Sequence, residues 1–216
     1  SGKKHKVIAI TSSVSGEGKT TLITYLGHIL EKGNYKVITI DLDMRRSKLA
    51  ESAKVPNLKG MSTLLSDRDS IEDVIVRSEE FNMDVIPGGP IPPNPSELIM
   101  SDKMKEVIAA LSQKYDYVLL DTPPVGLVTD AMILMNQVDM TLLVARANYS
   151  KKEFIRNLDH MVKSHELKNI GIILNGVELG KKGGYGYGYG YGYGYGYGYG
   201  YGYGSDKYYH ADNSSK

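Results

Sequence analysis

The chain has 216 residues, and its 26 Lys and Arg residues against 25 Asp and Glu residues give a formal net charge of +1. Proteins that bind duplex nucleic acid usually carry a basic stripe, so this balance argues against a nucleic-acid partner. The absence of cysteine excludes disulfide scaffolds and thiolate zinc sites. Because no apolar run approaches the roughly 18 residues of a membrane helix and no signal peptide opens the chain, we expect a soluble cytosolic protein.

Most of the chain alternates short, β-branched apolar runs with longer amphipathic stretches. The apolar runs predict buried parallel strands at 6–11, 35–41, 83–87, 116–121, 140–145 and 168–175. Helical spacing of apolar residues predicts helices at 19–32, 96–114 and 150–165, with Asn94 or Ser96 as the cap of the second. Strands that alternate with helices form right-handed βαβ units. We therefore predict an α/β fold over residues 1–179, with a doubly wound, mostly parallel sheet flanked by helices.

A repeat of tyrosine and glycine follows this region. Residues 183–204 contain 12 Gly and 10 Tyr, almost all in alternation. Glycine at every second position weakens a strand and leaves one of its faces without side chains. We expect residues 180–216 to form a disordered tail in the isolated monomer, with β-like self-association as the alternative.

A phosphate-binding loop is predicted after the first strand. Residues 12–21, SSVSGEGKTT, lie between that strand and the first helix, as a P-loop requires. In a P-loop at this position, the backbone N–H groups would surround the β-phosphate of a nucleotide. Lys19 would bridge the β- and γ-phosphates, and the Thr20 hydroxyl would ligate Mg²⁺. Ser13 replaces the usual leading glycine, and a glycine-rich turn without a ligand is the alternative. The residues expected to bind the nucleotide are Ser15, Gly16, Glu17, Gly18, Lys19, Thr20 and Thr21.

Three acidic residues end two other predicted strands. Asp41 ends the run at 35–41, Asp43 lies two residues further on, and Asp121 ends the run at 116–121. The carboxyl ends of parallel strands meet at one edge of a sheet, so these acids should converge near Lys19 and Thr20. Carboxylate oxygens suit a hard cation on a triphosphate. Each acid taken singly is also compatible with a helix cap or a turn.

The three segments together resemble a known family. GEGKTT, IDLDMRR and YVLLDTPP resemble Walker A, Walker A′ and Walker B of the bacterial tyrosine kinases, a branch of the P-loop ATPases unrelated to eukaryotic protein kinases. The resemblance extends through residues 85–99 and 171–179, and a tyrosine-rich C-terminal tail is a hallmark of this family. Partition and septum-placement ATPases are close by motif, but Val14 stands at the position of their signature lysine.

The resemblance implies a role for each matching residue. Catalytic roles fall on Lys19, Asp41, Asp43 and Asp121. Asp41 would accept the proton of the substrate tyrosine, and Asp43 and Asp121 would hold Mg²⁺ with Thr20, directly or through water. Asn175 would hydrogen-bond the adenine edge. The Walker A′ arginines, Arg45 and Arg46, would contact phosphate or a neighbouring subunit, with a solvated turn as the alternative.

The implied function is that of an ATP- and Mg²⁺-dependent protein-tyrosine kinase that phosphorylates its own tail and regulates export of an extracellular polysaccharide. The expected acceptors are Tyr185, Tyr187, Tyr189, Tyr191, Tyr193, Tyr195, Tyr197, Tyr199, Tyr201, Tyr203, Tyr208 and Tyr209. A passive tether or an adhesive segment is the alternative for the tail. A switch ATPase or a non-enzymatic regulator is the alternative for the whole chain.

Partners also follow from the resemblance. Many family kinases are joined to, or activated by, a transmembrane partner, so we expect a location at the inner face of the plasma membrane through a part outside this sequence. Family members usually carry a Glu-x-x-Arg-x-x-Arg helix before the first strand, used for ring assembly. Since SGKKHKV lacks it, we expect this sequence to be a catalytic piece that acts on other copies of itself.

Overall fold

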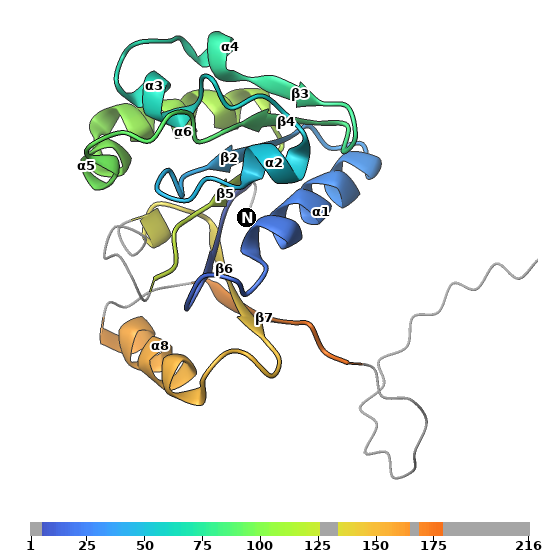
Figure 1. The fold of residues 1–216 in the computed structure, drawn as a ribbon, viewed down its shortest axis with the longest axis vertical. Helices are drawn as coiled ribbons and strands as arrows, with labels where there is room; N and C mark the ends of the chain where they lie inside the picture. Colours follow the sequence, from blue (N-terminus) through green and yellow to red (C-terminus); the bar gives the residue numbers. More distant parts are fainter. Residues whose placement is uncertain (1–5, 126–133, 165–168, 179–216) are drawn as a thin grey trace, which may run out of the picture. The chain divides into compact units, whose positions relative to one another are not determined.

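The computed structural model describes residues 6–125, 134–164 and 169–178 (Figure 1). The chain divides into two units, Ser1–Glu178 and Leu179–Lys216. The predicted disordered tail, residues 180–216, lies outside the described residues. All of the described residues belong to the first unit.

The described strands form a single sheet in the order β3-β4-β2-β5-β1-β6-β7. All neighbouring strands run parallel except β3 and β4. The predicted mostly parallel sheet is confirmed. The antiparallel edge strand β3 was not predicted, because its three residues are too short for a periodic pattern. The strands are β1 (Lys6–Ser12), β2 (Val37–Asp41), β3 (Val76–Ser78), β4 (Met83–Ile86), β5 (Tyr117–Asp121), β6 (Met140–Arg146) and β7 (Ile170–Asn175).

Helices flank this sheet, and the first has the predicted bounds. The helices whose bounds the structure describes are α1 (Lys19–Lys32), α2 (Leu49–Ala53), α3 (Met61–Leu65), α4 (Ile71–Val74), α5 (Pro95–Met100), α6 (Asp102–Lys114) and α8 (Lys152–Ser164). The prediction of one helix over 96–114 was wrong. Ser101 has extended backbone angles, and its Oγ accepts a hydrogen bond from the Met104 N–H (3.3 Å) while donating to the Leu98 carbonyl (2.7 Å). This cap ends α5 and starts α6.

The core lies on both faces of the sheet, because successive strand residues point to opposite sides. In β5, Leu120 packs in one cluster with Val107 of α6, whereas Leu119 packs in a second cluster with Ile23 of α1. Figure 1 shows α1 and α6 on opposite sides of the sheet. A sheet covered on both faces explains why the strands appear as continuous apolar runs.

The topology positions the predicted site. Strands β2, β5 and β1 are neighbours, and Asp41 at the end of β2 is in register with Asp121 at the end of β5. The P-loop follows β1 at the same edge. Among the described helices, none is both long and apolar enough to cross a membrane.

Candidate nucleotide and phosphoryl-transfer site

The P-loop forms an open turn between β1 and α1. Gly16 and Gly18 have φ angles of 88° and 97°, in the left-handed region that favours glycine. Gly18 is the N-cap of α1, and no side chain caps this end. The first N–H groups of a 14-residue helix thus remain available to an anion, and the helix dipole favours negative charge there.

Lys19 lies between two of the predicted acids. Its Nζ is 3.5 Å from Asp121 Oδ1 and 3.9 Å from Asp43 Oδ2. The Thr20 hydroxyl donates a 2.7 Å hydrogen bond to Asp121 Oδ2. The structure therefore brings together four residues from three strand ends: the P-loop pair Lys19 and Thr20, Asp43 after β2, and Asp121 of β5.

Asp121 is more deeply buried than Asp43, with 1% of its surface exposed. Burial raises the pKa of Asp121 to about 7, and the nearby Lys19 ammonium only partly offsets this effect. Its Oδ1 accepts no hydrogen bond from any described residue. A buried oxygen without a donor suits a cation, so Thr20, Asp43 and Asp121 fit a Mg²⁺ site.

The number of acids also limits the kind of metal site. Within the part of the chain that the structure describes, no three His, Asp or Glu side chains are grouped closely enough to enclose a metal ion. Mg²⁺ keeps several waters and is usually held by one or two carboxylates together with substrate phosphates. The residues present fit this open arrangement better than an all-protein cage.

Asp41 holds the loop that follows β2. It is fully buried, and burial raises its pKa while hydrogen bonds oppose the rise. Its Oδ1 accepts from the Asp43 N–H (3.0 Å), and its Oδ2 accepts from the Ser47 hydroxyl (2.7 Å) and the Leu49 N–H (3.2 Å). Asp41 therefore fixes the backbone that carries Asp43. Its role as the base stays a prediction.

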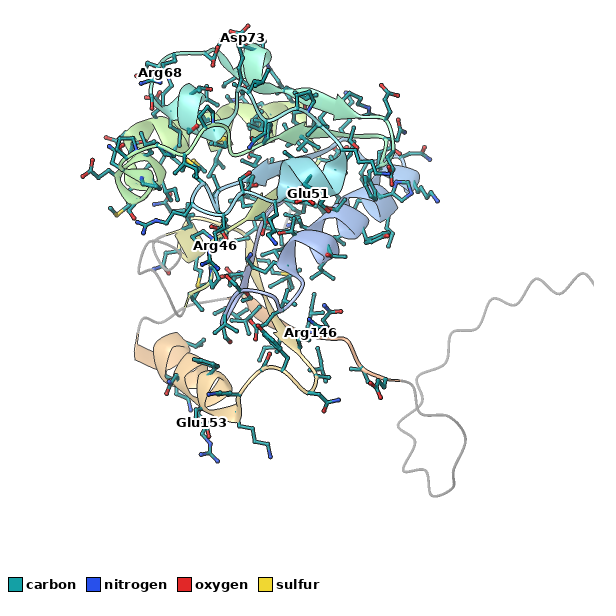
Figure 2. The ribbon with its side chains drawn as sticks, viewed as in Figure 1. Arg46, Glu51, Arg68, Asp73, Arg146 and Glu153 are labelled. Atoms are coloured by element: carbon teal, nitrogen blue, oxygen red, sulfur yellow. The ribbon has the colours of Figure 1, made fainter. Side chains whose placement is uncertain are left out.

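A cavity of about 510 Å³ opens over the P-loop. Figure 2 labels both arginines that line it, Arg46 from the loop after β2 and Arg146 from the end of β6. Arg45 instead donates to the Ser96 hydroxyl (3.2 Å). Sequence reasoning missed Lys48 and Arg146, although Arg146 also ends a parallel strand. The cavity is lined by Ser15, Gly16, Gly18, Lys19, Thr20, Thr21, Asp43, Arg46, Lys48, Arg146, Asn175 and Gly176.

Asn175 lies at the rim of this cavity, at the end of β7. Its Nδ2 donates to the Glu17 carbonyl (2.9 Å), and its Oδ1 accepts from the Gly176 N–H (2.8 Å). One Nδ2 hydrogen remains for a further acceptor. The predicted contact with adenine therefore stays a prediction, and Asn175 also supports the P-loop. The predicted acceptor tyrosines, from Tyr185 to Tyr209, lie outside the described residues.

Known proteins resemble this chain over most of its length. A family model described as an AAA domain matches residues 5–172. The chain is 36% identical over 178 residues to tyrosine-protein kinase CpsD of Streptococcus agalactiae, covering 82% of this chain and 77% of that protein. It is 35% identical over 174 residues to tyrosine-protein kinase wzc of Salmonella typhi, covering 81% of this chain but 24% of that protein.

The fold agrees as well. The kinase domain of Escherichia coli tyrosine kinase ETK superposes with a TM-score of 0.79 at 33% identity, over 88% of this chain and 74% of that one. The resemblance found in the motifs is thus confirmed over most of the described residues. By both sequence and fold, the chain belongs to the bacterial tyrosine-protein kinases, a family of P-loop ATPases.

Proposed function

We propose that this chain is an ATP- and Mg²⁺-dependent protein-tyrosine kinase that phosphorylates the tyrosine cluster near its own C-terminus. The observation that carries the proposal is the meeting of four side chains: Lys19, Thr20 and Asp43 line the P-loop cavity, and Asp121 contacts Lys19 and Thr20 from below the surface. Membership of the tyrosine-protein kinase family supports transfer to tyrosine rather than to water.

The P-loop binds the phosphates of ATP in this proposal. The free N–H groups at the start of α1 receive the β-phosphate, and Lys19 supplies a positive charge to the β- and γ-phosphates. Both ion pairs of Lys19 are long, at 3.5 and 3.9 Å, so its ammonium can turn to a phosphate at little cost. Transfer relies on this positioning and charge neutralisation more than on covalent chemistry.

Thr20, Asp43 and Asp121 hold Mg²⁺, directly or through water. The bound ion supplies neutralisation of the charge on the phosphate oxygens. Thr20 and Asp121 would hold the ion through the hydroxyl and carboxylate oxygens that share a hydrogen bond without it. A neighbouring cation lowers the pKa of a carboxyl, so Asp121 would be ionised there and its proton would go to solvent.

Asp41 accepts the proton of the acceptor phenol. An ionised carboxylate offers about four lone-pair positions, and the loop uses three of them at Asp41. The fourth position is covered here, because Asp41 is fully buried, so the phenol reaches it only when the covering residues move. The raised pKa of Asp41 makes it a stronger base than an exposed aspartate. The hydrogen bonds from Ser47 and Leu49 would hold the carboxylate in place during transfer.

The test is incubation with Mg·ATP, followed by mapping of phosphotyrosine by mass spectrometry. Lys19→Met should abolish nearly all phosphorylation, because it removes charge that stabilises the transition state. Asp41→Asn should keep ATP affinity within a few-fold and lose transfer. Equal loss of ATP binding in both variants would show that Asp41 only holds the loop.

The competing functions give other products. Hydrolysis of ATP without phosphotyrosine would support a switch ATPase. Members of that class carry a signature lysine at the position where this chain has Val14. The absence of both hydrolysis and phosphotyrosine would support a non-enzymatic regulator that acts through the Tyr-Gly repeat.

The partners proposed are other copies of this chain and a transmembrane activator at the inner face of the plasma membrane, in a system that exports polysaccharide. This chain covers 24% of wzc, so wzc is long enough to carry further domains beside its kinase domain. If acceptor and active site lie on different copies, the specific rate of tail phosphorylation should rise with protein concentration. A rate independent of dilution would indicate reaction within one copy.

A further inference from the structure

Three successive carbonyls of the P-loop accept hydrogen bonds from side chains far away in the sequence. The Tyr149 hydroxyl donates to the Ser15 carbonyl (3.0 Å), and Arg146 Nη1 donates to the Gly16 carbonyl (3.2 Å). Asn175 Nδ2 donates to the Glu17 carbonyl (2.9 Å). The partners lie at the end of β6, in the loop before α8 and at the end of β7.

The direction of these carbonyls fixes the direction of the N–H groups. Every described peptide is trans, so the N–H that follows each carbonyl points the opposite way. Holding the carbonyls of Ser15, Gly16 and Glu17 therefore orients the N–H groups of Gly16, Glu17 and Gly18. Successive N–H groups turned to one side make an anion-binding concavity.

The Glu17 side chain provides a fourth attachment. It is fully buried, and its carboxyl accepts from the Val14 N–H (3.0 Å) and from the Ser150 hydroxyl. Ser150 Oγ in turn accepts from the Arg146 N–H (2.7 Å). A buried carboxyl without donors is costly, so the hydrogen bond from Ser150 stabilises the loop in this shape.

The loop that carries these donors is itself ordered by local contacts. The Ser150 N–H donates to the Arg146 carbonyl (2.9 Å), and the Arg146 guanidinium lies 5.5 Å from the centre of the Tyr149 ring. Asn148 between them has a φ of 57°, as in a tight turn. Arg146, Tyr149 and Ser150 thus present their donors to the P-loop as one unit.

We infer that Arg146, Tyr149 and Ser150 are positioning residues that hold the P-loop open for phosphate before the nucleotide arrives. They act through the loop carbonyls and the Glu17 carboxyl rather than on the reacting atoms. A P-loop without them has to order its own N–H groups on binding, which weakens affinity for nucleotide. The inference rests on the nucleotide-binding part of the proposed function only.

The test measures ADP binding to the full chain by calorimetry, because ADP needs the loop but no transfer. Tyr149→Phe removes one hydroxyl and keeps the ring beside Arg146, and it should weaken ADP binding about threefold to tenfold. Ser150→Ala should weaken it about tenfold or more, and Ser150→Thr should restore most of the affinity. The matched control is Tyr25→Phe, on the exposed side of α1, where the hydroxyl has no hydrogen bond with a described residue. It should bind ADP as the parent does.

Two further measurements separate positioning from general stability. The melting temperature of nucleotide-free Tyr149→Phe should stay within about 2 °C of the parent, since surface changes rarely exceed 0.5 kcal/mol. Hydrogen exchange of the amides of Gly16, Glu17 and Gly18 should be faster in both Tyr149→Phe and Ser150→Ala.

Several results would overturn the inference: parent-like ADP affinity in both variants, unchanged exchange of these amides, or a matching fall in affinity and melting temperature in Tyr149→Phe. Failure of the parent to bind ADP would overturn it too. ADP binding by the parent without phosphotyrosine would instead defeat only the proposed kinase activity.

Discussion

Replacement of Asp121 by Asn should stabilise the nucleotide-free protein while destroying its activity. Burial raises the pKa of Asp121 to about 7, whereas an aspartate in an unfolded chain titrates near 3.9. The folded state therefore keeps a proton that the unfolded state loses between about pH 4 and pH 7. Stability present below pH 4 is lost as the pH rises toward 7.

The size of this effect follows from the pKa difference of about 3. At about 1.4 kcal/mol for each tenfold change, ionised Asp121 lowers the free energy of unfolding by up to about 4 kcal/mol above pH 7. The free energy of unfolding falls by about 2 kcal/mol, half of this total, between pH 5.5 and pH 8. Asn has the shape of the protonated acid and can still accept the hydrogen bond of Thr20, so the variant avoids this loss.

The assay is urea unfolding of parent and Asp121→Asn at pH 5.5 and pH 8, without nucleotide and with a chelator. The variant should be more stable, and its advantage should grow by about 2 kcal/mol between the two pH values. Asp67→Asn is the matched control: Asp67 is an exposed carboxylate with a positive φ that Asn tolerates, and the change should stay below about 0.5 kcal/mol.

Addition of Mg·ADP should reverse the order. The parent gains the coordination that Asp121 provides, whereas the variant offers only a neutral amide, so Mg·ADP should stabilise the parent more. An advantage of Asp121→Asn that is equal at both pH values would refute the idea that an ionised, buried Asp121 limits stability. So would a variant that is less stable than the parent.

The remaining predictions concern the glycines, the lysine and the tail. Gly18→Ala should reduce ADP affinity at least tenfold by calorimetry, because its Cβ would lie 2.2 Å from Asn175 Nδ2 at a φ of 97°. Gly60→Ala should cost about 2 kcal/mol or more in urea unfolding, since its Cβ would lie 2.1 Å from the Pro87 carbonyl oxygen and the backbone must shift; parent-like stability would contradict this. In Lys19→Met, loss of a neighbouring positive charge should raise the pKa of Asp121 further, and NMR titration of its carboxyl carbon checks the direction. Replacing the ten repeat tyrosines by Phe should remove most of the phosphate that the parent acquires in Mg·ATP; phosphate elsewhere in equal amount would contradict the tail as main acceptor.

The structure also changes how Asp41 is understood. From the sequence, Asp41 and Asp43 were two acids at the end of one strand, and only the family resemblance gave them different roles. In the structure, Asp41 is buried under three donors from its own loop, whereas Asp43 reaches Lys19 and the cavity. The loop between residues 41 and 49 therefore depends on Ser47, a residue that no motif singles out.

The sequence by itself determined the P-loop, the acids at the strand ends and the α/β class. These features depend on contiguous residues, such as the run GEGKTT before a helical pattern, and on the rule that parallel strands end at one edge. Helix α1 was predicted to the residue for the same reason, since glycines bound it on both sides.

Only the tertiary structure decided the rest. The split of the predicted helix at Ser101 depends on a local cap that competes with a continuous apolar pattern. The support of the P-loop by Arg146, Tyr149, Ser150 and Asn175 joins residues 130 to 158 positions apart. No periodicity or spacing encodes such contacts, because they arise only when β1, β6 and β7 are placed side by side in the sheet.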